Sequence, residues 1–415
     1  MGSMKDEALY DAVRFERRLW QLQRGTGMSR RDALTRLGWA ALGGAAFASG
    51  LSLPRAARGQ EMPPPVVKPT PDSIFRTLNT NRETLFEAFA GQGYLTPASH
   101  FFVRNHTNTP TLDAATWSLR IEGSGVDNPT SFSYEDLLCL PSVTRTRAIE
   151  CAGNGRSFFD TQQGTPASGT AWRLGAIGVA EWRGVRLSDL LDRAGVRADA
   201  LDVMPEGLDP VVGTDGVDGH VRRPLSIEKA LDDVLVVYEM NGQPLPPDHG
   251  FPARILVPGW VGIANIKWVG RIEVSTEPLF STWNTTQYRF TGASYPDTPV
   301  LTTQVPKSAF ELPFPATLPA GPAQLTGRSW SPHGSIRGVE ISTDGGASWA
   351  PATLTGRNVR QAWVQWRFGW QAPPGAHVLK ARATDSAGNV QPDTAVFNDG
   401  GYLFDAVVNH PVTVA

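Results

Sequence analysis

A thiol, a carboxylate and a guanidinium group lie close together in one short stretch of the chain, E-C-A-G-N-G-R at Glu150–Arg156. The preceding residues, R-T-R-A-I, have the pattern of a strand, so we expect Cys151 on the loop that follows it. A free cysteine is more often a small buried residue than a reactive one. The alternative is a thiolate ligand, on a loop whose glycines let the backbone approach a large group.

Basic side chains gather in three further stretches that share no obvious structural pattern. These stretches are F-F-V-R-N-H at Phe101–His106, D-H-G-F-P-A-R at Asp248–Arg254, and N-I-K-W at Asn265–Trp268. Arginine, lysine and histidine side chains pair with phosphate and other anions. Each stretch alone would be unremarkable. Together they supply many anion-binding groups in a chain whose formal net charge is only -2.

Short helices and strands are expected to carry these stretches. Helices are predicted at Ser133–Leu138, at Leu187–Gly195 with a serine cap and a glycine stop, and at Ser226–Leu231 with a serine cap. Strands are predicted at Val234–Glu239 and Ala253–Pro258, on either side of the turn N-G-Q-P-L-P. This mixture predicts an α+β fold.

The sequence pattern changes after about Pro299, from mixed helix and strand signals to strand signals alone. Alternating stretches such as W-V-Q-W-R-F-G-W and H-V-L-K-A-R-A-T-D are separated by turn clusters, which predicts an immunoglobulin-like β-sandwich. We therefore divide the chain into a signal region at 1–60, a linker at 61–75, an α+β domain at 76–299 and the sandwich at 300–415.

Composition narrows the classes of function. Hydrophobic residues make up 41% and charged residues 19% of the 415 residues, which indicates a globular protein with no charge signal for a nucleic-acid partner. Two cysteines, Cys139 and Cys151, exclude a disulfide framework, a four-cysteine zinc site and a C-x-x-C-H haem attachment. A disulfide between the two remains open, and it would exclude a metal role for Cys151.

An export signal is predicted near the N-terminus. Arg30 and Arg31 stand directly before the uncharged run Leu37–Leu53, which is the twin-arginine arrangement, and Ala56–Gln60 suits cleavage. Ala33 replaces the usual phenylalanine, Met28 is an alternative start, and an uncleaved membrane anchor is the other interpretation. Twin-arginine export moves folded proteins, commonly with a cofactor, so we expect a periplasmic, cofactor-binding protein.

Taken together, these motifs resemble the sulfite oxidase family of molybdenum enzymes. The resemblance runs from about Phe101 to the C-terminus and is most specific in C-A-G-N-G-R and in Y-E-M-N-G followed by D-H-G-F-P. It implies a bound Mo-molybdopterin cofactor, with Cys151 as the protein ligand of the metal. Cys139 matches no ligand position and is expected to pack in the interior.

The resemblance also implies which residues contact the pterin and the substrate. The pterin contacts are Phe102, Val103, Arg104, Asn105, His106, Asp209, His249, Arg254, Asn265, Ile266 and Lys267. Among them His249, Arg254 and Lys267 suit the phosphate, and Asp209 suits pterin N–H groups, unless it is only a turn residue before Pro210. The catalytic pocket maps onto Arg104, Arg156, Trp172 and Tyr288.

One position departs from the family pattern. Animal relatives place an arginine from the C-terminal domain in the pocket, within W-N-L-R-G, whereas this chain has F-N-D-G-G with Gly400 at that place. The pocket is therefore expected to be more open or less basic, which leaves the choice of substrate in question.

The resemblance implies oxidation of sulfite to sulfate, with electrons passing to a separate cytochrome c because no haem is expected in this chain. A homodimer formed through the sandwich is the expected assembly. Alternatives within the family are a sulfane dehydrogenase subunit of a thiosulfate-oxidising system and a sulfoxide or oxoanion reductase. A secreted carbohydrate-binding or sialidase-like protein is the alternative outside it, because S-T-D-G-G-A-S-W at Ser342–Trp349 fits the Asp-box pattern. That pattern occurs once rather than once per propeller blade, so we interpret it as a hairpin turn.

Overall fold

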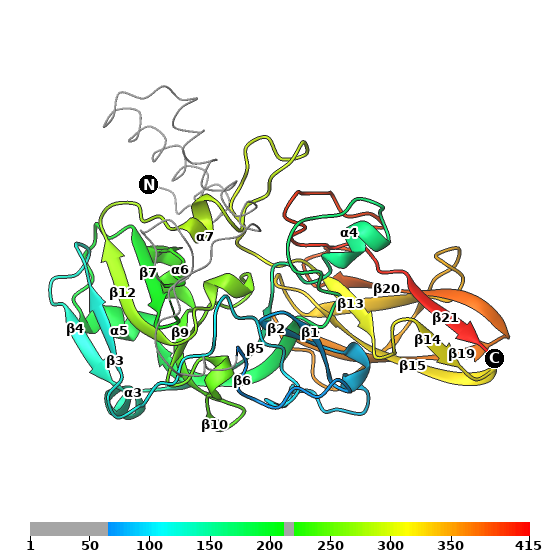
Figure 1. Cartoon of the computed structure of the whole chain (residues 1–415), viewed down its shortest axis with the longest axis horizontal. Helices are drawn as coiled ribbons and strands as arrows, with labels where there is room; N and C mark the ends of the chain where they lie inside the picture. The colour runs from blue at the N-terminus through cyan, green and yellow to red at the C-terminus, as the bar shows by residue number, and fades with distance from the viewer. Residues whose placement is uncertain (1–64, 211–219) are drawn as a thin grey trace, which may run out of the picture.

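The computed structural model describes residues 65–210 and 220–415. The predicted signal region, including Arg30, Arg31 and the run Leu37–Leu53, lies outside the described residues. The molecule is elongated: an α+β lobe holds β3 to β12, and a β-sandwich lobe holds β13 to β21 (Figure 1). The hairpin of β1 (Phe75–Leu78) and β2 (Asn81–Thr84) lies between the two lobes (Figure 1).

Two sheets build the α+β lobe. The first has the order β10 (Gln243–Pro244), β9 (Leu235–Met240), β6 (Ile177–Arg186) and β5 (Val143–Glu150), with β11 (Arg254–Leu256) also paired to β9. The second has the order β4 (Thr130–Ser133), β3 (Ser118–Glu122), β12 (Val269–Ser275), β7 (Asp202–Gly207) and β8 (Leu225–Ser226). All neighbours in both sheets are antiparallel except β3 and β12. The pairing of β9 with β11 confirms the predicted strands on either side of the N-G-Q-P-L-P turn.

Three short helices of this lobe test the predicted caps. In α3 (Tyr134–Cys139), Ser133 and Asp136 form a capping box, and in α6 (Ile227–Asp232), Ser226 accepts from the Lys229 N–H, as expected. The serine cap predicted for α5 (Leu187–Arg193) is wrong: the helix begins one residue before Ser188, so Arg186 takes the cap position without a side-chain hydrogen bond. Gly195 ends that helix at φ +67°, where a glycine stop is favoured.

The two cysteines are free, so the open disulfide alternative is excluded. The prediction that Cys139 packs in the interior is wrong. Helix α3 buries only Leu137, and Cys139 lies exposed at its last position. A helix this short has a single inward-facing stripe, and Leu137 occupies it.

The sandwich consists of two sheets, one of four strands and one of five. One has the order β13 (Lys307–Phe310), β15 (Gly321–Trp330), β19 (Trp363–Ala372) and β18 (Thr353–Thr355). The other has the order β14 (Ala316–Leu318), β21 (His410–Val414), β20 (Gly375–Asp385), β16 (Ile336–Ser342) and β17 (Ala350–Pro351). Every second residue of β20 from Leu379 onward is buried, as strand alternation predicts. The Asp-box stretch is the turn between β16 and β17, so the hairpin interpretation is confirmed.

The two lobes share a hydrophobic core. The α+β side supplies Phe89 from η1 (Phe86–Phe89) and Phe159 from α4 (Ser157–Thr161), and the sandwich side supplies Trp330, Trp363 and Phe404. The rings of Phe89 and Trp363 meet edge to face at 5.3 Å, as do Phe159 and Phe404 at 5.0 Å. Because this contact is extensive and apolar, the lobes are held in one arrangement.

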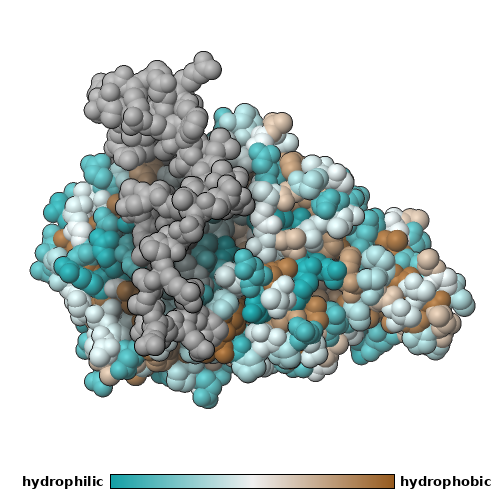
Figure 2. Space-filling model, in the orientation of Figure 1, coloured by the Kyte–Doolittle hydropathy of each residue, from teal (hydrophilic) through white to brown (hydrophobic). Residues whose placement is uncertain are grey.

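Figure 2 shows the outer surface of the molecule from one side. On the visible part of the face in Figure 2, hydrophobic residues are scattered among hydrophilic ones. Among the described residues, no helix is both long enough and apolar enough to cross a membrane.

A buried ion pair crosses the interface beside Cys151. Lys307 of β13 and Glu150 of β5 are 1% and 2% exposed, and Lys307 Nζ lies 2.7 Å from Glu150 Oε1. Asn154 Nδ2 donates to the same carboxylate oxygen, and the indole N–H of Trp330 donates to Oε2. Each charge therefore has several partners, which is what a buried ion pair requires.

Replacing Lys307 with methionine should lower the free energy of unfolding by about 3–5 kcal/mol, because the Glu150 carboxylate would stay buried without its cation. Urea denaturation monitored by tryptophan fluorescence would measure the change. A Glu150→Gln/Lys307→Met double variant should recover part of the loss.

Lys229→Met is the matched control, because the pair of Lys229 with Asp233 is more exposed, at 10% and 31%. That control should lose about 1 kcal/mol or less. An equal loss in both single variants would contradict the account of the interface.

Candidate active site

One cavity of the α+β lobe collects most of the residues singled out in the sequence. It encloses about 80 Å³ of space. The predicted residues that line it are Phe102, Arg104, Asn105, His106, Cys151, Asp209, His249, Arg254, Asn265, Ile266, Lys267 and Tyr288. The structure thus brings together side chains that are scattered over nearly two hundred positions of the chain.

The Cys151 loop, Cys151–Arg156, follows directly from β5 and is fixed by backbone hydrogen bonds. Cys151 N–H donates to the carbonyl oxygen of Ala176, and Asn154 N–H donates to that of Cys151. Gly155 has φ +95°, and a methyl group there would lie 3.0 Å from Cβ of Phe404. The glycine is therefore needed for a close approach, and the loop holds a buried thiol at the cavity wall.

Tyr288 and His106 form a neutral hydrogen-bonded pair on another wall. The Tyr288 hydroxyl lies 3.3 Å from His106 Nε2, and the His106 ring packs on Trp283 of α7 (Thr282–Thr285) at 4.3 Å. Burial raises the pKa of Tyr288, and burial with the nearby Arg104 lowers the pKa of His106 well below its usual value. Near neutral pH the phenol is protonated and the imidazole uncharged, so the pair offers hydrogen bonds without adding charge.

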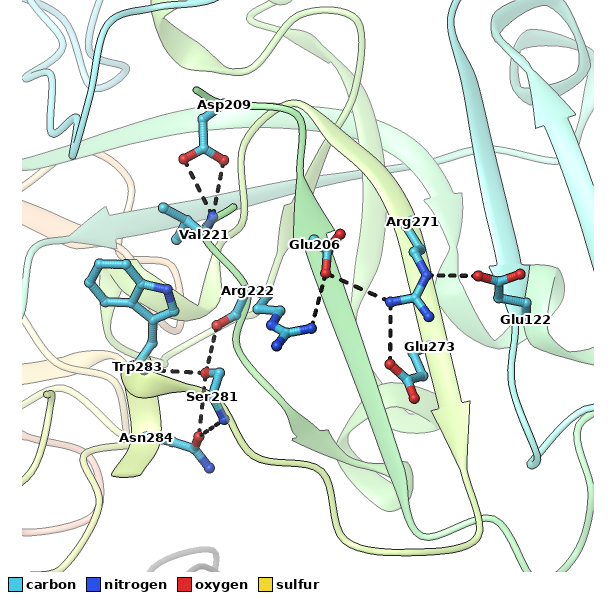
Figure 3. A network of polar contacts seen from close by, with 10 residues as sticks. All are labelled: Glu122, Glu206, Asp209, Val221, Arg222, Arg271, Glu273, Ser281, Trp283 and Asn284. Carbon is cyan, nitrogen blue, oxygen red and sulfur yellow. Dashed lines mark hydrogen bonds and ion pairs between the residues drawn. The ribbon is translucent and has the colours of Figure 1, made fainter. Parts of the chain in front are cut away.

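The ends of β7 and β12 deliver Asp209 and Lys267 to the same place. The two strands are antiparallel neighbours, so residues after β7 meet residues before β12. Figure 3 shows the polar contacts around these strands: Asp209 accepts from the Val221 N–H, and Arg271 links Glu122, Glu206 and Glu273. Burial raises the pKa of Asp209, so its side chain is more than a solvated turn residue.

The three predicted phosphate ligands, His249, Arg254 and Lys267, line the same cavity. Arg254 donates to the carbonyl oxygens of His249 and Asn265 at 3.0 Å each, while its buried Nε has no partner among the described residues. Burial lowers the pKa of Arg254 to about 9 and lowers those of His249 and Lys267 well below their usual values. A buried cluster of this kind favours an anionic ligand.

Lys68 is a further member of this cluster, which the sequence did not indicate. Its Nζ donates to the carbonyl oxygens of Ala98 and Phe101 and lies 3.5 Å from His249 Nε2. Burial lowers the pKa of Lys68 to about 7. The residue belongs to the stretch at 61–75 predicted to be a linker. The prolines of that stretch favour an extended, exposed chain, so nothing in the sequence indicated a buried lysine.

The described part of that stretch, from residue 65 onward, is bound to the domain rather than extended in solvent. The N–H groups of Val67 and Lys68 both donate to the Asp248 carboxylate, and Asn105 Nδ2 donates to the carbonyl oxygen of Pro65. Asp248 also accepts from the Thr109 hydroxyl at 2.6 Å and lines the cavity. Sequence reasoning missed Asp248, although it stands next to His249 in the D-H-G-F-P motif.

Three predicted residues do not line this cavity. Val103 pairs through its backbone with Arg82. Trp172 is fully buried next to Phe102, with the two ring centroids 6.3 Å apart. Its indole N–H has no hydrogen-bond partner among the described residues. Arg156 lies beside the cavity, over the ring of Tyr402 at 5.0 Å. Tyr402 in turn stacks on the cavity residue Tyr288 at 5.4 Å, so Arg156 is one ring away from the wall.

These features fit the implied Mo-molybdopterin group. The buried Cys151 thiol offers a soft ligand for molybdenum, and the unpaired Arg254 Nε with His249, Lys267 and Lys68 offers a site for the phosphate. Asp209 offers an acceptor for ring N–H groups. The residues present therefore supply each kind of contact that the group needs.

The cofactor-free protein should become more stable relative to a Lys68→Met variant as pH rises from about 7 to 10. The pKa of Lys68 is about 7 in the folded protein, whereas its ordinary value is 10.5, so the unfolded chain binds more protons in this range and protonation opposes folding. Below pH 7 the penalty is fully present, and it fades as both states lose the proton.

Urea denaturation of both proteins at several pH values would measure this difference. Lys380→Met, on β20 in the other lobe, is the control and should show no such trend. A difference between the wild type and Lys68→Met that stays constant with pH would contradict the burial of the amine.

Family models match both lobes. A model described as an oxidoreductase molybdopterin binding domain matches residues 106–283, and one described as a Mo-co oxidoreductase dimerisation domain matches residues 305–413. Among solved structures, the sulfane dehydrogenase SoxCD from Paracoccus pantotrophus superposes with a TM-score of 0.72 at 27% identity, covering 91% of this chain and 98% of that chain.

Curated relatives agree with these matches. Mitochondrial sulfite oxidase of Rattus norvegicus is 36% identical over 342 residues, which are 76% of this chain but 61% of the relative, so this chain spans about three-fifths of that protein. Sulfite oxidase of Gallus gallus is 33% identical over 333 residues, which are 75% of this chain and 72% of the relative. With Cys151, the buried cations and both lobes in place, the chain belongs to the sulfite oxidase family of molybdopterin enzymes.

Proposed function

We propose that this protein oxidises sulfite to sulfate at a molybdenum-pterin centre bound to Cys151. The observation that carries the proposal is the placing of Arg104, Cys151 and Tyr288 on one cavity, with Arg156 next to it. In the net reaction sulfite gains one oxygen atom that comes from water, two protons are released, and two electrons leave. When bound, the molybdenum group supplies the oxygen transfer and accepts the electrons.

The chain's own residues bind and orient the anion. Arg104 and Arg156 offer positive charge to an entering oxyanion. Tyr288 offers its hydroxyl as a donor, and the raised pKa of that group keeps it protonated at working pH. His106 holds the Tyr288 hydroxyl in place and, being uncharged, does not compete with the arginines for the anion. The burial of these groups strengthens each contact relative to the same contact in water.

The place and the partners of the reaction are also part of the proposal. The Arg30–Arg31 pair and the run Leu37–Leu53 support export by the twin-arginine machinery to the periplasm. A soluble c-type cytochrome would take the electrons there. The match of residues 305–413 to a family model described as a dimerisation domain supports a homodimer.

A second function within the family is oxidation of sulfane sulfur. The superposition on SoxCD covers nearly the whole of that chain, and Gly400 stands where animal relatives have a pocket arginine. A less basic pocket suits a substrate with less negative charge than sulfite. Sulfoxide or oxoanion reduction has no comparable observation in its favour.

Sulfite-dependent reduction of ferricyanide and of cytochrome c by purified, molybdenum-loaded protein would test the main proposal. We expect fast turnover by the wild type and by Cys139→Ser, which changes the exposed cysteine. Cys151→Ser should lose turnover by at least a hundredfold, the order of the loss when one catalytic contact is removed.

Full molybdenum content with no sulfite turnover would overturn sulfite oxidation. Thiosulfate-derived sulfane and sulfoxides would then be tested with the same protein. Equal losses in Cys139→Ser and Cys151→Ser would instead contradict the assignment of Cys151 as the ligand.

A further inference from the structure

A loop of the sandwich lobe, Asn398–Phe404, is fastened to the Cys151 loop. The N–H of Leu403 donates to the carbonyl oxygen of Ala152 at 2.8 Å, and Arg156 Nε donates to that of Gly400 at 2.8 Å. Within the 398–404 loop, Asn398 accepts from the Tyr402 N–H and donates to the Tyr402 carbonyl oxygen. These hydrogen bonds hold Tyr402 at a fixed place beside the Cys151 loop.

The ring of Tyr402 contacts two residues of the proposed substrate pocket. One face stacks on Tyr288, with ring centroids 5.4 Å apart and planes at 27°, and the Arg156 guanidinium carbon lies 5.0 Å from the Tyr402 centroid. The Tyr402 hydroxyl accepts a long hydrogen bond from the Tyr288 N–H at 3.4 Å. Tyr288 has φ +54° and Leu403 has φ +52°, a backbone region that non-glycine residues rarely adopt and that is often found at functional sites.

Arg156 lies in a slot that leaves part of its guanidinium available. Nε and Nη1 donate to the carbonyl oxygens of Gly400 and Thr170, whereas Nη2 has no hydrogen-bond partner within residues 65–210 and 220–415. Methyl groups built on Gly153 and Gly169 would lie 2.6 and 3.0 Å from Nη1. The slot therefore admits the arginine only because side chains are missing around it, and the Tyr402 ring forms the remaining wall.

Gly400 and Tyr402 compete for the same space. A methyl group on Gly400 would lie 2.4 Å from Cε2 of Tyr402, so a side chain at position 400 and the observed position of the Tyr402 ring exclude each other. The aromatic ring thus occupies the volume into which an arginine at position 400 would project. It adds no charge of its own and instead orients the positive charge of Arg156 by a cation–π contact.

We propose that Tyr402 is a specificity-determining residue of the anion pocket. It acts as a clamp, because its ring holds the Arg156 guanidinium beside the pocket and packs against the ring of Tyr288. This inference rests on the proposed function, because it assumes that a small sulfur oxyanion binds at Arg156. Tyr402 sets the position of one cation, so its effect falls on anion affinity rather than on the rate of the bound complex.

The experiment compares Tyr402→Phe, which keeps the ring, with Tyr402→Leu, which keeps an apolar but smaller side chain and removes the aromatic face. Steady-state kinetics with sulfite should show KM about tenfold higher in Tyr402→Leu, with kcat within about twofold of the wild type. Tyr402→Phe keeps the aromatic face and loses only the long hydrogen bond from the Tyr288 N–H, so its KM should rise by about twofold at most. Tyr134→Leu, which changes a half-buried tyrosine of α3 that does not line the cavity, is the control and should match the wild type.

A second readout does not require turnover. The dissociation constant of sulfate, measured by calorimetry on the molybdenum-loaded protein, should rise by about the same tenfold in Tyr402→Leu and by about twofold at most in Tyr402→Phe. If sulfite is not oxidised but sulfate binding follows this pattern, the proposed reaction fails and the clamp stands. Unchanged KM and unchanged sulfate affinity in Tyr402→Leu would overturn the clamp, as would equal weakening in Tyr402→Phe.

Discussion

The buried ion pair between Lys307 and Glu150 is the contact on which the rest of the site depends. Glu150 is the last residue of β5 and the neighbour of Cys151, whereas Lys307 begins the first strand of the sandwich. A buried charge without its partner is costly, so the two strands cannot separate without exposing both groups to water. The place of the Cys151 thiol is therefore set by the contact between the lobes as well as by its own loop.

The sandwich contributes to the chemistry through the same interface. Beside the ion pair, Trp330 and Gln304 donate to Glu150, and the 398–404 loop bonds to Ala152 and Arg156. On the far side of the thiol, the cavity carries several buried basic groups, whose protonated forms an anionic cofactor would stabilise. The residues that hold the thiol and its neighbours in place therefore come from both lobes.

Much of this arrangement could be predicted from the sequence, for definable reasons. The Ser133 and Ser226 caps, the alternating strands of the sandwich and the C-A-G-N-G-R loop are local patterns, and each is confirmed in the fold. Most proposed pterin contacts fall in motifs that resemble the family and line one cavity. Lys68, Asp248 and Tyr402 were missed because their roles come from contacts between distant segments. The cap of α5 failed because the helix begins one residue early, at Leu187.

X-ray absorption at the molybdenum edge tests the central claim most directly, because it counts the sulfur atoms bound to the metal. The loaded wild-type protein and Cys139→Ser should show the same number of sulfur neighbours. Cys151→Ser, to the extent that it retains metal, should show one fewer. Identical sulfur coordination in Cys151→Ser and the wild type would mean that the metal is not bound where the two lobes hold the thiol, and the account of the site would fail.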